Sequence, residues 1–260
     1  MPATTAALVG TTGGAGTTRT CLELASTLAA TGDDVAVLDA TADTQGLARH
    51  LSGRLDPDAT ALVTEETDRP LAEGLVEYDP GADRAALDTE ALPDPGRVAC
   101  LPARAPFERL ARAKTPEAAQ ELDRRIDEAA TEFDRVLVDV PAIPSNPAVA
   151  AVTAAERVAL VTPATERGVD AVQTIRGRLQ DVGTGADAVL AVDRAGTGAF
   201  PETDADATIP EFDRTAPAGL ETEAGVEALT TAADGVLDRS LDLPCADGGL
   251  VETVTSLRED

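Results

Sequence analysis

The chain has 260 residues, and 43% of them are hydrophobic, which is enough for a large folded core. It carries 47 acidic residues against 21 basic ones and shows no basic patch, which argues against a broad nucleic-acid surface. No apolar run has the length of a transmembrane helix and the N-terminus lacks a signal-peptide pattern, so we expect a soluble cytoplasmic protein.

Short apolar strands alternate with amphipathic helices along the chain, a pattern that predicts a parallel sheet. Residues 5–10 are predicted as the first strand, followed by a glycine-rich turn and a helix that ends near Gly32. Further strands are predicted at 33–40, 96–103, 133–142, 156–164, 186–194 and, ending at Pro210, within 206–214. Further helices are predicted at 115–131, 168–181 and 223–238. The expected fold is α/β, a doubly wound, mainly parallel sheet flanked by helices.

Residues 52–96 are rich in Pro, Gly, Asp and Thr, and helical stretches such as 70–77 are short. We interpret this region as a variable surface excursion and not as a separate domain. The organisation expected is one domain over residues 1–245, followed by a C-terminal segment at 246–260.

The C-terminal segment has a possible amphipathic pattern, with Leu250, Val251, Val254 and Leu257 on one helical face. Its flanking charges are mostly acidic, which suits an anionic membrane poorly. Membrane contact through 248–260 is therefore disfavoured against a short helix docked on the core or on a partner.

The acidic residues are spread along the whole chain instead of forming a tail. Dense surface carboxylates keep a protein hydrated, and concentrated salt screens their mutual repulsion. This composition is typical of a protein from an extreme halophile. The three cysteines, Cys21, Cys100 and Cys245, are far apart and show no metal-binding spacing, so a disulfide framework is not expected.

The glycine-rich turn between the first strand and the first helix is the main candidate site. Backbone N–H groups at a helix N-terminus attract anions, and glycines let the backbone approach phosphates closely. The alternative is a turn of this fold class that binds nothing. The expected cofactor-binding residues of the turn are Gly13, Gly14, Ala15, Gly16, Thr17 and Thr18.

Carboxylates follow two of the predicted strands, where the edge of a parallel sheet brings strand ends together. Asp139 could hold magnesium, directly or through a water molecule. Asp43 or Asp39 could orient a water molecule for attack on a phosphate. The alternative for each of these acids, in so acidic a chain, is a solvated residue at the end of a strand.

With these residues in view, the chain resembles the ParA/MinD family of deviant P-loop ATPases over most of its length. The family loop K-G-G-x-G-K-T-T corresponds to Thr12–Arg19. The family strand fDyviiDxPa corresponds to FDRVLVDVPA at 133–142, and vvlNr and iPed correspond to AVLAVDR at 188–194 and TIPEFD at 208–213. The resemblance implies ATP and magnesium as cofactors, the Thr18 hydroxyl as a magnesium ligand beside Asp139, and a possible homodimer.

Several residues depart from the family pattern. Thr17 and Thr12 replace the two loop lysines, one that contacts phosphates and one that reaches across a dimer. Arg19 lies about 200° around the helix from Thr17 and should face away from the loop. Asp193 replaces an adenine-facing asparagine, and with Pro210 it completes the expected cofactor-binding residues.

The family's catalytic aspartate has no ungapped counterpart in this chain. That position holds Thr41, and Asp43 takes it only with a two-residue insertion. The Gly-Gly-x-Gly-Thr-Thr loop also resembles the subgroup of pilus-assembly positioning proteins (TadZ/CpaE-like).

Positively charged side chains that bind the transferring phosphoryl group raise its transfer rate roughly 10³–10⁵-fold. Because both loop lysines are replaced, we expect weak ATP binding with little hydrolysis. The resemblance implies a role in spatial organisation or regulation. Two alternatives stay open: a nucleotide-free scaffold that binds a protein partner, and an active ATPase of altered mechanism.

Overall fold

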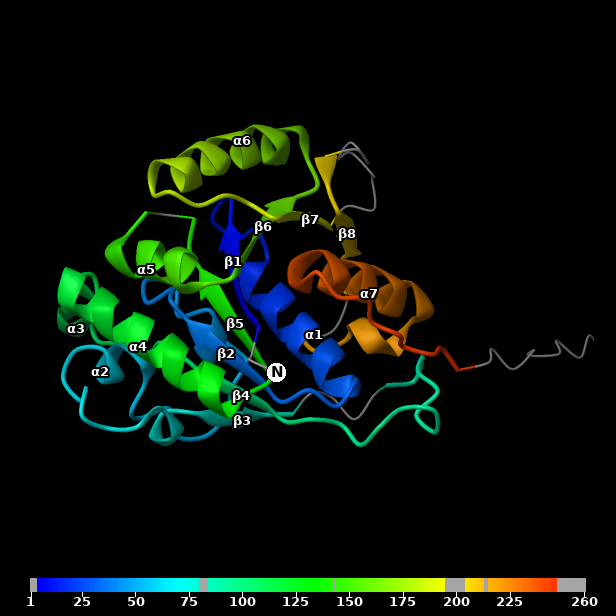
Figure 1. Cartoon of the computed structure of the whole chain (residues 1–260), viewed down its shortest axis with the longest axis horizontal. Coiled ribbons are helices and arrows are strands. Elements are labelled where there is room, and N and C mark those ends of the chain that lie inside the picture. Colours follow the sequence, from blue (N-terminus) through cyan, green and yellow to red (C-terminus); the bar gives the residue numbers. More distant parts are fainter. Residues whose placement is uncertain (1–3, 80–83, 143, 195–203, 213–214, 247–260) are drawn as a thin grey trace, which may run out of the picture.

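An eight-stranded sheet forms the centre of the molecule, in the order β3-β4-β2-β5-β1-β6-β7-β8 (Figure 1). The computed structural model describes residues 4–79, 84–142, 144–194, 204–212 and 215–246. The strands are β1 (Thr4–Gly10), β2 (Val35–Asp39), β3 (Val76–Tyr78), β4 (Val98–Leu101), β5 (Arg135–Val140), β6 (Arg157–Pro163), β7 (Ala188–Asp193) and β8 (Ala207–Pro210). All neighbouring strands pair in parallel except β3, which pairs with β4 in the antiparallel direction.

The α-helices connect these strands and begin at residues suited to helix starts. They are α1 (Thr17–Ala30), α2 (Ala59–Leu62), α3 (Phe107–Arg112), α4 (Pro116–Glu132), α5 (Asn146–Ala154), α6 (Glu166–Asp181) and α7 (Glu223–Leu237). Short 3₁₀ helices lie at η1 (Leu47–Arg49), η2 (Leu71–Glu73) and η4 (Gly219–Glu221). The hydroxyls of Thr115, Ser145, Thr165 and Thr222 accept a backbone N–H at the starts of α4, α5, α6 and α7.

Helices cover both faces of the sheet, so the central strands are buried on both sides and are apolar almost throughout. One face packs against α4, α5 and α6, which contribute Leu122, Val152 and Ile175. The other face packs against α1 and α7, which lie side by side (Figure 1). This two-layer cover fixes β1 and the start of α1 in the middle of the fold, where the candidate loop joins them.

The doubly wound fold predicted from the alternation of elements is confirmed. Gly32 follows α1 with a left-handed φ of +91°, as a residue after a helix C-terminus often does. The region 52–96 is more structured than predicted, because β3 adds an edge strand to the sheet. The helices α3 and α5 were also not predicted; α5 is short and rich in alanine, so it has little amphipathic pattern.

Within the described ranges, no helix combines the length and apolarity needed to cross a membrane. The amphipathic pattern at Leu250, Val251, Val254 and Leu257 lies outside the described residues, as does all of 246–260 except Ala246.

Candidate functional site

The carboxyl ends of β1, β2, β5 and β7 meet at one edge of the sheet, where ligands bind in folds of this type. A cavity of about 570 Å³ lies there. The candidate loop lines it with Gly13, Gly14, Ala15, Gly16, Thr17 and Thr18, all six predicted from the sequence. The structure therefore places the whole predicted loop on one cavity.

Two glycines give the loop its shape. Gly14 and Gly16 have left-handed φ angles of +75° and +98°, which residues with a Cβ rarely adopt. Gly16 precedes α1, and no side chain caps this helix start. Since the first N–H groups of a helix have no partner within it, those of α1 are available to an anion in the cavity.

Thr17 does not extend into the cavity as a lysine would. A Cβ on Gly10 would lie 2.6 Å from the Thr17 Oγ1, so the hydroxyl folds back against the end of β1. The loop itself thus provides backbone donors and no side-chain cation.

Thr18 and Asp139 meet as predicted. The Thr18 hydroxyl donates to Oδ2 of Asp139 over 2.5 Å, and Asp139 is 1% exposed at the end of β5. Its other oxygen, Oδ1, is buried without a hydrogen-bond partner. Gly46 lies against this contact, since a Cβ there would be 2.6 Å from the Thr18 Oγ1. A buried carboxylate with an unpaired oxygen is costly unless a ligand completes it.

Asp39 lies beside Asp139, because the two are paired in register between β2 and β5. Burial, followed by the charge of Asp39, raises the pKa of Asp139 to about 8, although the Thr18 hydroxyl lowers it. Burial also raises the pKa of Asp39, against hydrogen bonds from Thr41 and the Ala103 N–H that lower it. Two neighbouring buried carboxyl groups favour the approach of a cation.

The donor atoms suit a magnesium ion that arrives with a phosphate. Magnesium at phosphate sites usually keeps several waters and binds one or two carboxylates together with the phosphates. Thr18 Oγ1 and the unpaired oxygen of Asp139 are donors of this kind. Across the described ranges there is no cluster of three His, Cys, Asp or Glu residues that could hold a metal without such a ligand.

The two alternatives for the water-orienting acid occupy different environments. Asp39 is buried and accepts hydrogen bonds from both the N–H and the hydroxyl of Thr41. Asp43 lines the cavity and forms an ion pair of 2.8 Å with Lys114, the only lysine of the chain. Asp43 is therefore better placed to meet a ligand, although Lys114 neutralises its charge.

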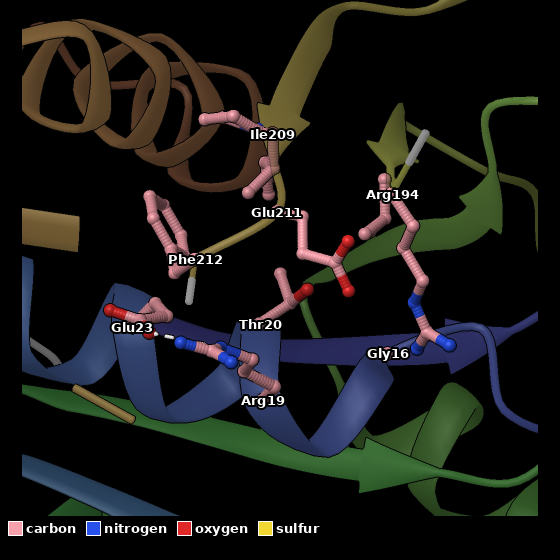
Figure 2. Close-up of a pocket in the computed structure, with 10 residues that line it drawn as sticks. Gly16, Arg19, Thr20, Glu23, Arg194, Ile209, Glu211 and Phe212 are labelled. Atoms are coloured by element: carbon pink, nitrogen blue, oxygen red, sulfur yellow. Dashed lines mark hydrogen bonds and ion pairs between the residues drawn. The ribbon is translucent and has the colours of Figure 1, made fainter. Parts of the chain in front are cut away.

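Pro210 and Gly16 of the loop line a smaller cavity of about 100 Å³. Figure 2 shows this cavity. Its apolar walls include Val192, Ile209 and Phe212. Asp193 pairs in register with Pro210 but does not line this cavity. It lines an adjoining hollow together with Pro210, so the two predicted residues share that hollow and only Pro210 also lines the smaller cavity.

Arg19 extends away from the loop, in the predicted direction. Its Nε donates to the Glu23 carboxylate over 3.2 Å, and its guanidinium lies 5.4 Å from the centre of the Phe212 ring (Figure 2). The sequence signal for the ion pair is the spacing of four residues between Arg19 and Glu23. Arg19 nevertheless lines both the large and the smaller cavity, as does Arg194, which was not predicted.

No protein-family model and no curated protein sequence matches the chain. Solved structures match it over almost its whole length. Septum site-determining protein MinD from Pyrococcus horikoshii, complexed with Mg-ADP, is 19% identical with a TM-score of 0.69, covering 89% of this chain and 95% of its own. The MinC:MinD cell division protein complex from Aquifex aeolicus gives 18% identity and a TM-score of 0.70, covering 93% and 98%. Cobyrinic acid a,c-diamide synthase from Mycobacterium smegmatis, with bound ATP analog and magnesium, is 16% identical with a TM-score of 0.66. The match covers 94% of this chain and 98% of the synthase chain.

The chain has the fold of the ParA/MinD-like P-loop NTPases. At these low identities the likeness concerns the fold alone. Since this fold carries both cell-division proteins and a biosynthetic enzyme, the function has to be argued from the residues of the P-loop cavity.

Proposed function

We propose that the chain is a ParA/MinD-like nucleotide-binding protein with a degenerate P-loop, which binds Mg-ATP weakly and hydrolyses it little. The observation that carries this proposal is the contact between Thr18 and Asp139 beneath the glycine loop. It joins the first turn of α1 to the end of β5, with an unpaired carboxylate oxygen beside a cavity large enough for a nucleotide.

Each residue has a separate task in this proposal. The N–H groups of the loop and of the start of α1 would bind phosphate oxygens. Thr18 and Asp139 would hold magnesium, which supplies positive charge to the phosphates when it is bound. The smaller cavity, with Pro210 at its edge, would take the base against Val192 and Phe212. Asp43 is the residue proposed to orient water, from the rim of the cavity.

Slow turnover follows from the missing lysines. Cations that stabilise the transferring phosphoryl group contribute roughly 10³–10⁵ to the rate where they have been removed and measured. Thr12 and Thr17 offer no such charge, and Thr17 is folded against Gly10. Binding depends less on these lysines because the backbone donors of the loop remain.

A regulatory or positioning role is proposed by analogy with structures of the same fold. One of them is a septum site-determining protein and another is a complex of MinD with MinC. We therefore propose a cytoplasmic protein that forms a homodimer or binds a protein partner. The Gly-Gly-x-Gly-Thr-Thr loop, which resembles that of pilus-assembly positioning proteins, adds pilus positioning to the proposed roles.

We also propose a high-salt environment. Among the acidic residues that the structure describes, only Glu23, Asp39, Asp58 and Asp139 are buried, so the others remain at least partly in contact with solvent. Their repulsion is screened when the ionic strength is high. Measurements on this chain should therefore be made in molar KCl.

Two measurements test the proposal. Isothermal titration of the chain with Mg-ATP in molar KCl should give saturable binding, and a phosphate-release assay should stay near background. Absence of binding would favour the nucleotide-free scaffold. A robust rate of phosphate release that disappears in Asp139→Ala would instead establish an active ATPase of altered mechanism.

A further inference from the structure

Arg194 places a positive charge over the P-loop. It follows the last residue of β7, and its side chain extends toward the loop near Gly16 (Figure 2). Its Nη2 donates to the Gly14 carbonyl over 2.8 Å, and a Cβ on Gly16 would lie 3.5 Å from the same nitrogen. A residue 180 positions away in the sequence therefore touches the tip of the loop.

No carboxylate in the described part of the chain forms an ion pair with Arg194. Within the described ranges its one hydrogen bond is to Gly14, whereas Arg19 is paired with Glu23 and Lys114 with Asp43. A guanidinium has five N–H donors, so most of its donors remain for a ligand. The chain has a net charge of −26, so an exposed positive charge at this place can attract an anionic ligand that the rest of the surface repels.

Arg194 lies where the large and the smaller cavity adjoin. It lines the large cavity with the loop and also the smaller cavity with Val192 and Phe212. A nucleotide whose base occupies the smaller cavity would pass its phosphates beside this guanidinium. The lysine position, Thr17, cannot supply a cation there.

We propose that Arg194 is the phosphate-binding cation of this site and takes over the electrostatic part of the missing loop lysine. This inference rests on the proposed nucleotide binding. The ligand class is a nucleoside di- or triphosphate, whose oxygens accept charge-assisted hydrogen bonds from the planar guanidinium. Arginine stays protonated at all working pH values, so this charge is permanent.

The test compares ATP, ADP and adenosine by isothermal titration in molar KCl, with magnesium present. Arg194→Gln should weaken ATP binding about tenfold or more, because a hydrogen bond to a charged group is lost. Adenosine affinity should stay unchanged, and Arg194→Lys should recover part of the ATP affinity. Arg176→Gln is the matched control: Arg176 is exposed on α6 and lines neither cavity, so this change should leave all three affinities unchanged.

The outcomes separate this inference from the proposed function. If the unaltered chain binds ATP and Arg194→Gln binds it equally well or more tightly, Arg194 is not a phosphate ligand, and only this inference falls. Equal losses of affinity for ATP and adenosine would show that Arg194 only holds the loop in shape through Gly14, and would also overturn this inference. If the unaltered chain binds no ATP, the proposed function falls and takes this inference with it.

Discussion

The two sides of the P-loop cavity present groups of opposite kind: two buried carboxyl groups on one side and an exposed guanidinium on the other. On the side of β2 and β5, Asp39 and Asp139 are almost fully buried and lie next to each other in the sheet. On the side of β7, Arg194 is exposed and, among the residues that the structure describes, is bonded only to the backbone carbonyl of Gly14. The first side is suited to a cation and the second to an anion, so together they suit a magnesium phosphate. The predictions below perturb these sides in turn.

The largest effect is expected at the buried side. Asp139→Ala removes the carboxylate proposed to hold magnesium and leaves the Thr18 hydroxyl without its acceptor. We expect Mg-ATP affinity to fall about 100-fold, as for loss of charged hydrogen bonds. Isothermal titration in molar KCl measures this. Asp170→Asn, on the exposed surface of α6, is the control; an undiminished affinity in Asp139→Ala would contradict the assignment.

Gly46 offers a way to disturb the same contact without removing a charge. Its φ of −62° tolerates alanine, but the added Cβ would lie 2.6 Å from the Thr18 Oγ1 and would turn the hydroxyl away from Asp139. Gly46→Ala should therefore weaken Mg-ATP binding about tenfold. Gly177→Ala on α6, where a Cβ meets nothing within 4 Å, should have no effect on binding. Equal affinities of the two variants would show that the Thr18 contact is dispensable.

The buried side also predicts a pH dependence of stability. The pKa of Asp139 rises from 3.8 to about 8 on folding, mainly through burial. Between these two pH values the folded chain therefore keeps a proton on Asp139 that the unfolded chain has released. The contribution of Asp139 to stability is therefore greatest below pH 3.8 and declines as the pH rises to about 8. Asp139→Asn should flatten the fall of the unfolding temperature with pH, compared with the unaltered chain and Asp170→Asn. Parallel curves for all three would contradict this.

The smallest effect is expected at Arg49, the second cavity arginine without a carboxylate partner among the described residues. It follows β2, across β1 from β7, and its Nη2 donates to the Thr44 carbonyl over 3.2 Å. Because it is exposed and screened by salt, Arg49→Gln should weaken ATP binding only about two- to fivefold. Titration at two KCl concentrations measures this. A loss larger than that of Arg194→Gln would reverse the ranking of the two arginines.

The loop and the buried acids could be predicted from the sequence because their signals are local. The glycines of the turn lie between a strand and a helix, and Asp139 ends an apolar strand. That Asp39 lies next to Asp139 depends on the parallel pairing of β2 with β5, which only the strand order reveals.

The other side of the cavity has no local signal. The strand order β1-β6-β7 brings Arg194 and Gly14 together. The sequence around an arginine at the end of a strand does not indicate which distant residue it contacts. The ion pair of Asp43 with Lys114 is also long-range, because Lys114 follows α3, which was not predicted. The strand β3 was missed for a related reason: its three residues pair only along an edge of the sheet.

A crystal structure grown with Mg-ATP in molar KCl tests the central claim most directly. The account predicts phosphates against the loop from Gly13 to Thr18, magnesium between Thr18 and Asp139, and the Arg194 guanidinium on a phosphate oxygen. A loop without nucleotide at saturating Mg-ATP, with Thr18 still bonded to Asp139 and Arg194 still bonded to Gly14, would contradict it.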